Sequence, residues 1–158
     1  MYDVALLIER QLTALDADQI VALHEGLDEP VSYHILLPVE SSTAVLSSSM
    51  SALGAGQFMP PTEPDVLAEV QREIKTAGQS ELEASAALLR AKTKNVTELL
   101  TEDDPITALT ELVQSTNSAE AIILTEPHIV SEFFHVDWTS RARRKLNVPT
   151  LHLLEHVP

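Results

Sequence analysis

Several residue types are scarce in this chain of 158 residues, and each scarcity excludes a kind of site. There is no cysteine, which excludes a disulfide framework, a thiolate metal site and a thiol nucleophile. Aromatic residues make up only 4% of the chain, so the core must rest on Leu, Val, Ile and Ala. The four glycines are Gly26, Gly54, Gly56 and Gly78. Because backbone loops that wrap a phosphate usually depend on glycine, the chain beyond residue 78 lacks the residue from which such a loop is made.

Basic residues are also few. Ten Lys and Arg stand against 24 Asp and Glu, which gives a formal net charge of −14. Nucleic acids and anionic membranes attract cationic surfaces, so we expect neither as a general partner. The exception is a basic run, Arg141, Arg143, Arg144 and Lys145. Such a run is typical of a helix C-terminus, where cations interact favourably with the backbone dipole, and an anion or partner site is the alternative.

Long apolar segments are missing as well. The apolar stretch 4–8 is too short for a secretory signal, and the uncharged stretch 41–62 is too polar for a membrane span. Together with the absence of cysteine, this favours a cytoplasmic protein. The length and the apolar content of 44% predict a single domain over residues 1–158.

Short apolar runs alternate with helical patterns along the chain. Strands are predicted at 4–8, 33–37, 95–101, 121–124 and 148–154, and helices at 12–27, 64–91, 105–117 and 130–146. Short, continuously apolar strands are typical of a parallel sheet that is covered on both faces. The order therefore predicts an open, five-stranded, Rossmann-like α/β sheet with helices on both faces. The segment 41–63, rich in Ser, Ala, Gly and Pro, is expected to be a long flexible crossover within this domain.

This order of elements, over essentially the whole chain, resembles the universal stress protein family. Residues 120–124 resemble the family's "aDlIVmG" strand, and residues 147–154 resemble its closing "cPVLvV" strand. The segment 96–112 contains Asp103-Asp104-Pro105-Ile106, which resembles the family's strand, acidic-proline turn and helix. The resemblance implies a non-enzymatic stress or regulatory protein that forms a homodimer through the last strand.

Members of the family that bind ATP carry the motif G-x2-G-x9-G-[S/T] after the fourth strand. Aligned on that strand, the three glycine positions fall on Thr125, His128 and Trp138, and only the hydroxyl position, Thr139, matches. The family's first-strand aspartate falls on Glu9. We therefore interpret the nucleotide site as lost or refilled, and we expect no cofactor. The positions of this vestigial pocket are Glu9, Val39, Thr125, His128, Trp138 and Thr139.

The last predicted strand carries three apolar residues, Leu151, Leu153 and Leu154. An edge strand of this kind needs a cover, and pairing with a second copy of the chain supplies one.

An alternative function is a small-ligand-binding or enzymatic domain that uses the same strand ends. Glu9, Glu40 and Glu126 near those ends would favour a cationic or polar neutral ligand over a phosphate.

Other sequence features give weaker indications of a site. The Gly54-Ala55-Gly56 segment follows no predicted strand, and no catalytic motif is present. The six histidines show none of the usual metal-ligand spacings, so we expect no metal and a hydrogen-bonded or surface position for each. Phe134 and Trp138 lie on one side of the predicted last helix, where they either pack on the sheet or fill the vacated pocket.

Overall fold

The computed structural model describes residues 1–39, 64–125 and 141–154. The elements in chain order are β1 (Tyr2–Ile8), α1 (Ala14–Ala22), β2 (Val31–Pro38), α3 (Pro64–Arg90), β3 (Asn95–Thr101), α4 (Pro105–Thr116), β4 (Glu120–Thr125) and β5 (Thr150–Leu154). Residues 141–145 are also helical. The predicted crossover 41–63 and the first part of the predicted helix 130–146 lie outside the described residues.

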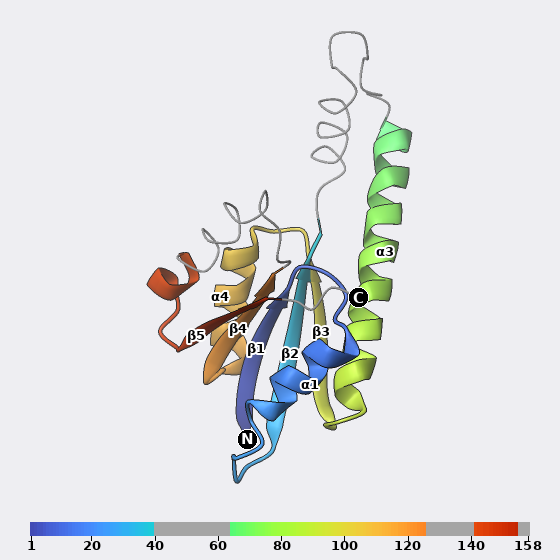
Figure 1. The fold of residues 1–158 in the computed structure, drawn as a ribbon. Helices are drawn as coiled ribbons and strands as arrows, with labels where there is room; N and C mark the ends of the chain where they lie inside the picture. The colour runs from blue at the N-terminus through green and yellow to red at the C-terminus, as the bar shows by residue number, and fades with distance from the viewer. Residues whose placement is uncertain (40–63, 126–140, 155–158) are drawn as a thin grey trace.

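The five strands form one parallel sheet in the order β3-β2-β1-β4-β5 (Figure 1). The central strand β1 pairs with β2 on one side and β4 on the other, and its residues 4–8 are fully buried. Such unbroken burial is what a parallel strand between two helical layers requires. The predicted fold class is therefore confirmed.

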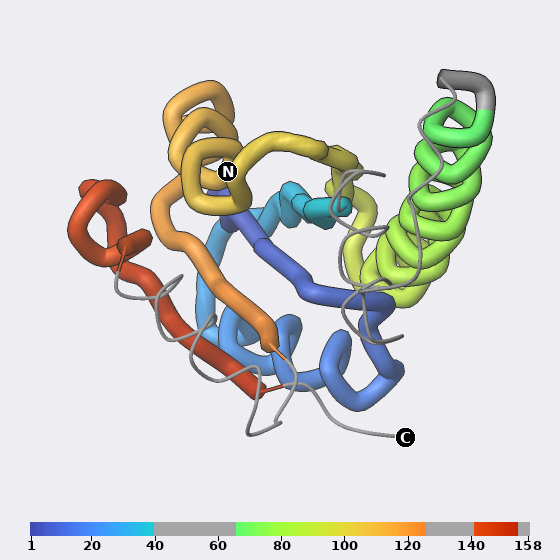
Figure 2. The backbone as a smooth tube through the Cα atoms, turned by 90° about the horizontal axis from the view of Figure 1, so that it is seen from above, coloured from blue at the N-terminus to red at the C-terminus, as the bar shows by residue number. Residues whose placement is uncertain are grey.

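Helices cover both faces of the sheet, and Figure 2 shows α1 and α4 on opposite sides. On one face, Ile20 of α1 and Leu82 of α3 pack with Leu6 of β1. On the other face, Leu109 of α4 and Ala142 pack with Leu7 of β1. Successive residues of a strand point to opposite faces, so a fully apolar strand contributes to both cores at once.

The helix predicted at 12–27 is shorter than expected. Thr13 forms the N-cap of α1 in a capping box with Asp16, so Leu12 lies before the helix, and the helix ends at Ala22. Leu15, Leu23 and Leu27 fit a helical pattern of apolar residues over this segment, but they are 55%, 49% and 41% exposed. These leucines lie outside the narrower face through which α1 contacts the core, which carries its buried residues Asp16, Ala17 and Ile20.

α3 extends beyond the sheet that it covers, as Figure 1 shows for its N-terminal turns. Gly78 lies level with the ends of β2 and β3. A Cβ atom at this position would lie 2.6 Å from Cγ1 of Val39 and 3.1 Å from Cδ1 of Leu100. Glycine weakens a helix interior, but here it allows the close approach of α3 to both strand ends.

β5 begins at Thr150 rather than at the predicted residue 148. Val148 packs against the core of the α4 face instead, and Pro149 has no N–H to donate to a strand neighbour.

None of the helices in the described ranges combines the length and the apolar character that a membrane span requires.

Candidate functional site

The carboxyl ends of β1, β2 and β4 meet at one edge of the sheet. The strand order reverses between β1 and β4, and ligands of open parallel sheets bind beyond the strand ends at such a point. Ile8 is aligned with Leu124, so Glu9 and Thr125 follow at the same level. The structure therefore brings Glu9, Val39 and Thr125 to three neighbouring strand ends. The other residues predicted there lie outside the described residues: Glu40, Glu126, His128, Trp138 and Thr139.

Thr125 is fixed by a hydrogen bond to the neighbouring strand. It is 1% exposed, and its Oγ1 lies 2.7 Å from Nε2 of His152 on β5. Thr125, which we predicted to correspond to the family's first glycine, is a β-branched residue with a buried, bonded side chain. For His152 the sequence predicted only a hydrogen-bonded or surface position. The alternation of side chains places both residues on the same face of the sheet, which is the signal that could have paired them.

The loop that leaves β1 is held against α3. The amide of Leu12 donates to Oγ of Ser85 at 2.9 Å, and the Ser85 hydroxyl donates to the carbonyl of Glu81 at 2.8 Å. Ser85 is fully buried. This bond fixes the backbone three residues beyond Glu9.

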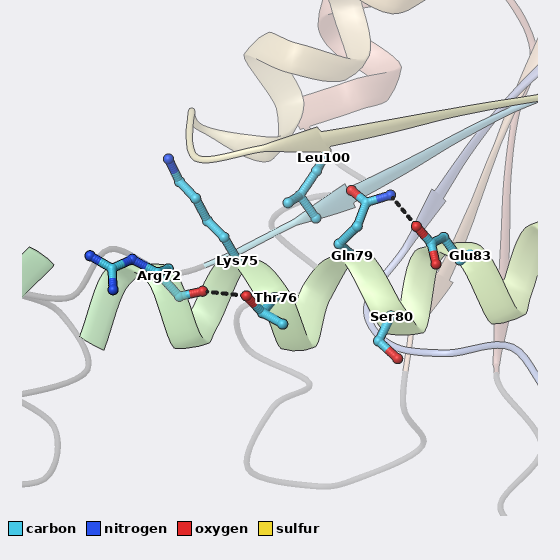
Figure 3. A pocket seen from close by; sticks show the side chains of 7 residues that line it. All are labelled: Arg72, Lys75, Thr76, Gln79, Ser80, Glu83 and Leu100. Carbon is cyan, nitrogen blue, oxygen red and sulfur yellow. Dashed lines mark hydrogen bonds between the residues drawn. The ribbon is translucent and has the colours of Figure 1, made fainter. Parts of the chain in front are cut away.

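A groove of about 570 Å³ runs along α3 beside Leu100 of β3 (Figure 3). Two of its polar side chains are bonded within the helix: Thr76 donates to the carbonyl of Arg72 at 2.8 Å, and Gln79 donates to Glu83 at 3.2 Å. Figure 3 shows Arg72 and Lys75 extending outward, away from a common centre. A binding site needs polar groups that converge, so this groove is not a candidate site.

The amino end of the sheet holds a buried histidine cluster that the sequence did not predict. Nδ1 of His24 lies 2.9 Å from the carbonyl of Ile20 and 2.8 Å from the hydroxyl of Tyr33, and Nε2 contacts Oε1 of Glu120. Burial, assisted by the charge of Glu120, raises the pKa of Tyr33 to about 12. Tyr2 closes the cluster, with its ring centroid 5.8 Å from that of His24. These contacts join the end of α1 to β2 and β4.

A second histidine at this end links three strands. Nε2 of His34 lies 2.9 Å from Oδ1 of Asp3, and its Nδ1 lies 2.7 Å from Oγ1 of Thr97. No motif in the sequence indicates this arrangement, because the three residues come from β1, β2 and β3. Among the described residues, no group of three or more His, Asp or Glu is placed to hold a metal ion.

The basic run begins with a structural ion pair. Nη2 of Arg141 donates to Oδ2 of Asp104 at 2.8 Å, and Asp104 is the N-cap of α4. The hydrogen bond from Arg141 is the main cause of the lowered pKa of the Asp104 carboxyl. The hydrogen bonds that Thr107 donates to the same carboxyl also lower this pKa. Residues 141–145 are helical, which fits the interpretation of the run as part of a helix end.

The fold is that of the universal stress proteins. UspA from Lactobacillus plantarum matches with a TM-score of 0.60 and 12% identity, over 98% of each chain. The universal stress protein from Archaeoglobus fulgidus in complex with dAMP matches with a TM-score of 0.55 and 8% identity, over 96% of this chain and 97% of that one. A universal stress protein in complex with cAMP matches with a TM-score of 0.59 and 10% identity, over 98% of this chain and 99% of that one.

No protein-family model matches the sequence, and no curated protein is significantly similar to it. The likeness at 8–12% identity therefore establishes the shared fold. The fold that the order of elements implied is confirmed.

Proposed function

We propose that this chain is a regulatory protein of the universal stress protein type that acts as a homodimer and does not bind adenine nucleotides through a glycine loop. It carries out no reaction at the carboxyl ends of its strands. The observation that carries the proposal is Thr125, which is buried and bonded to His152 at the position where a phosphate-wrapping loop would start.

Adenine nucleotides are the natural ligands to test, because two proteins of the same fold are in complex with dAMP and cAMP. A phosphate loop needs backbone amides in conformations that glycine adopts readily and a β-branched residue does not. Thr125 has such a branched side chain, and no glycine follows residue 78. A phosphate group would therefore find neither the backbone freedom nor the space for close approach.

The test is a titration of the full chain with a fluorescent adenine nucleotide, with the Archaeoglobus protein as positive control. We expect no saturable binding at micromolar concentrations. Saturable binding that unlabelled dAMP or ATP displaces would contradict this part of the proposal.

The two edges of the sheet differ in a way that supports dimerisation through β5. On β3, Arg90 donates to the carbonyl of Val96 at 3.2 Å and pairs with Glu98 at 2.8 Å, and such charges discourage pairing with another strand. On β5, Leu151 is 39% and Leu154 is 55% exposed. Of the three leucines assigned to the interface, Leu153 instead packs partly against the core.

The variant Leu154→Lys tests the dimer. A charge at this edge should convert the protein to a monomer, because a lysine on an edge strand opposes strand pairing. The matched control is Leu15→Lys on α1, where the leucine has the same exposure of 55%. The measurement is the molar mass by light scattering after gel filtration. A wild-type monomer, or equal effects of the two variants, would refute the proposed interface.

The second candidate function is binding of a non-phosphate ligand at the same strand ends. The hydrogen-bonded pair Thr125 and His152 supports it, because it places a hydroxyl and an imidazole beside the exit of β4. A thermal-shift screen with nucleotides, amines and metal ions separates the candidates. A stabilising amine or metal ion that loses its effect in Thr125→Val would favour the second, and no stabilising ligand favours the first.

A further inference from the structure

Asp3, His34 and Thr97 form a continuous hydrogen-bonded chain across β1, β2 and β3. The distances are 2.9 Å from Asp3 Oδ1 to His34 Nε2, and 2.7 Å from His34 Nδ1 to Thr97 Oγ1. His34 and Thr97 are direct partners in the β2–β3 register. The His34 side chain is only 10% exposed, whereas Thr97 is exposed. A nearly buried imidazole therefore bonds to an exposed threonine.

The proton positions in this chain follow from the chemistry of its members. A carboxylate only accepts hydrogen bonds, so Nε2 of His34 must carry the proton that it donates to Asp3. In the neutral imidazole the lone pair is then on Nδ1, which faces Thr97. The Thr97 hydroxyl donates to that lone pair, which is the arrangement that increases the nucleophilicity of a hydroxyl. Asp3 acts here as a positioning residue, because it selects the tautomer of His34.

A groove of about 410 Å³ lies between β3 and α4, and Leu99 of β3 is one of the residues that line it. Leu99 lies two residues beyond Thr97, on the same face of β3, and is 44% exposed. Ala108 and Leu112 of α4 line the same groove. The groove also contains the carboxylates of Asp103 and Glu111, which disfavour an anion. Its chemistry suits a neutral molecule with a short apolar group.

We propose that Thr97 is an acyl-accepting nucleophile for neutral esters with a short apolar acyl group. Its Oγ1 forms a bond to the acyl carbon while its proton moves to Nδ1 of His34. The bond from the acyl carbon to the leaving alcohol then breaks, and the proton passes from His34 to the departing oxygen. Water completes the cycle: it attacks the acyl carbon, gives a proton to His34, and the Thr97 oxygen leaves and regains that proton. Thr97 lies on the edge strand β3, whereas Glu9 and Thr125 lie at the ends of β1 and β4, so the proposal depends on neither dimerisation nor nucleotide binding.

The test uses the full chain and p-nitrophenyl butyrate. We expect a burst of p-nitrophenolate, and an acyl group that peptide mass spectrometry locates on Thr97. Thr97→Ala should abolish both, whereas Thr97→Ser should retain them. His34→Gln should slow acylation about 100-fold, as loss of a general base does. Asp3→Asn should also slow it, and the conservative Asp3→Glu should restore part of the rate, which a purely structural role would not produce.

The matched control is Thr93→Ala. This hydroxyl donates to the carbonyl of Val31 at 3.3 Å and does not belong to the hydrogen-bonded chain of Asp3, His34 and Thr97, so acylation should be unchanged. Circular dichroism of each variant reports folding, and the pair Thr97→Ala and Thr97→Ser decides the question if His34→Gln does not fold. Acylation confined to lysines, or equal labelling of Thr97 in the wild type and His34→Gln, would overturn the proposal.

Discussion

At the residue scale, the buried polar groups of the amino end depend on one another. His24 is 8% exposed and each of its ring nitrogens has an oxygen partner. Loss of a partner leaves a buried polar atom unsatisfied, which costs about 1–3 kcal/mol. Two of the partners, Ile20 and Tyr33, are close to His24 in the chain, whereas Glu120 lies 96 positions away. The sequence contains no local pattern that indicates such a pairing, so this cluster could not be predicted.

Tyr33 gives the cluster a pH dependence that can be measured. Its pKa is about 12 in the fold, above the ordinary tyrosine value of 10.0, so the fold favours the neutral phenol. The resulting stabilisation is fully present below pH 10 and is lost as the pH rises towards 12. A difference of this size corresponds to up to about 2–3 kcal/mol of unfolding free energy.

The chain has two tyrosines, so Tyr2→Phe leaves Tyr33 as the only phenol to titrate. We expect its phenolate absorbance to appear only near pH 12, or together with alkaline unfolding. In Tyr33→Phe, the free energy of unfolding should change less between pH 10 and 12 than in the wild type. A midpoint near pH 10 in the folded protein would show that the hydroxyl is not buried as described.

At the scale of elements, helix ends and strand positions follow from local chemistry. Asp104 before Pro105 predicts the start of α4, and Asn117 ends it in the left-handed conformation with φ of 53°. The exposure of side chains was less predictable. Leu15, Leu23 and Leu99 are apolar yet exposed, because each lies where no neighbouring element among the described residues covers it. Which face is covered depends on how elements pack, and the sequence pattern of one element does not contain that information.

Gly78 provides a test of packing between elements. In an exposed helix, Gly→Ala stabilises by about 1 kcal/mol. Here the new Cβ would meet Val39 at 2.6 Å, and overpacking costs about 1–3 kcal/mol. We expect Gly78→Ala to lower the free energy of unfolding by about 1 kcal/mol in urea denaturation.

The control for this prediction is Gly26→Ala, where nothing lies within 4 Å of the added Cβ, so stability should change little. Val39→Ala in the Gly78→Ala background should recover part of the loss, because the double variant removes the clash. Stabilisation by Gly78→Ala alone would mean that α3 does not approach β2 this closely.

At the scale of the whole molecule, the parallel sheet could be predicted from the sequence, but only part of the candidate site could. The positions of Glu9, Val39 and Thr125 at neighbouring strand ends follow from strand order alone. The bond from Thr125 to His152 depends on the register of β4 and β5, in which Ile123 is aligned with His152. Register is set by the packing of whole layers, so single segments do not reveal it.

The net charge of −14 predicts how the proposed dimer should respond to salt. Two such chains repel each other, and salt screens this repulsion over a distance of about 8 Å at physiological ionic strength. The proposed contact through Leu151 and Leu154 is apolar, so screening weakens the repulsion without weakening the attraction. We therefore expect the dissociation constant of the dimer, measured by sedimentation equilibrium, to fall as sodium chloride is raised from low to physiological concentration. An interface held by ion pairs would show the opposite trend. A dissociation constant that rises with salt would thus argue against an apolar β5 contact, even if the protein is a dimer.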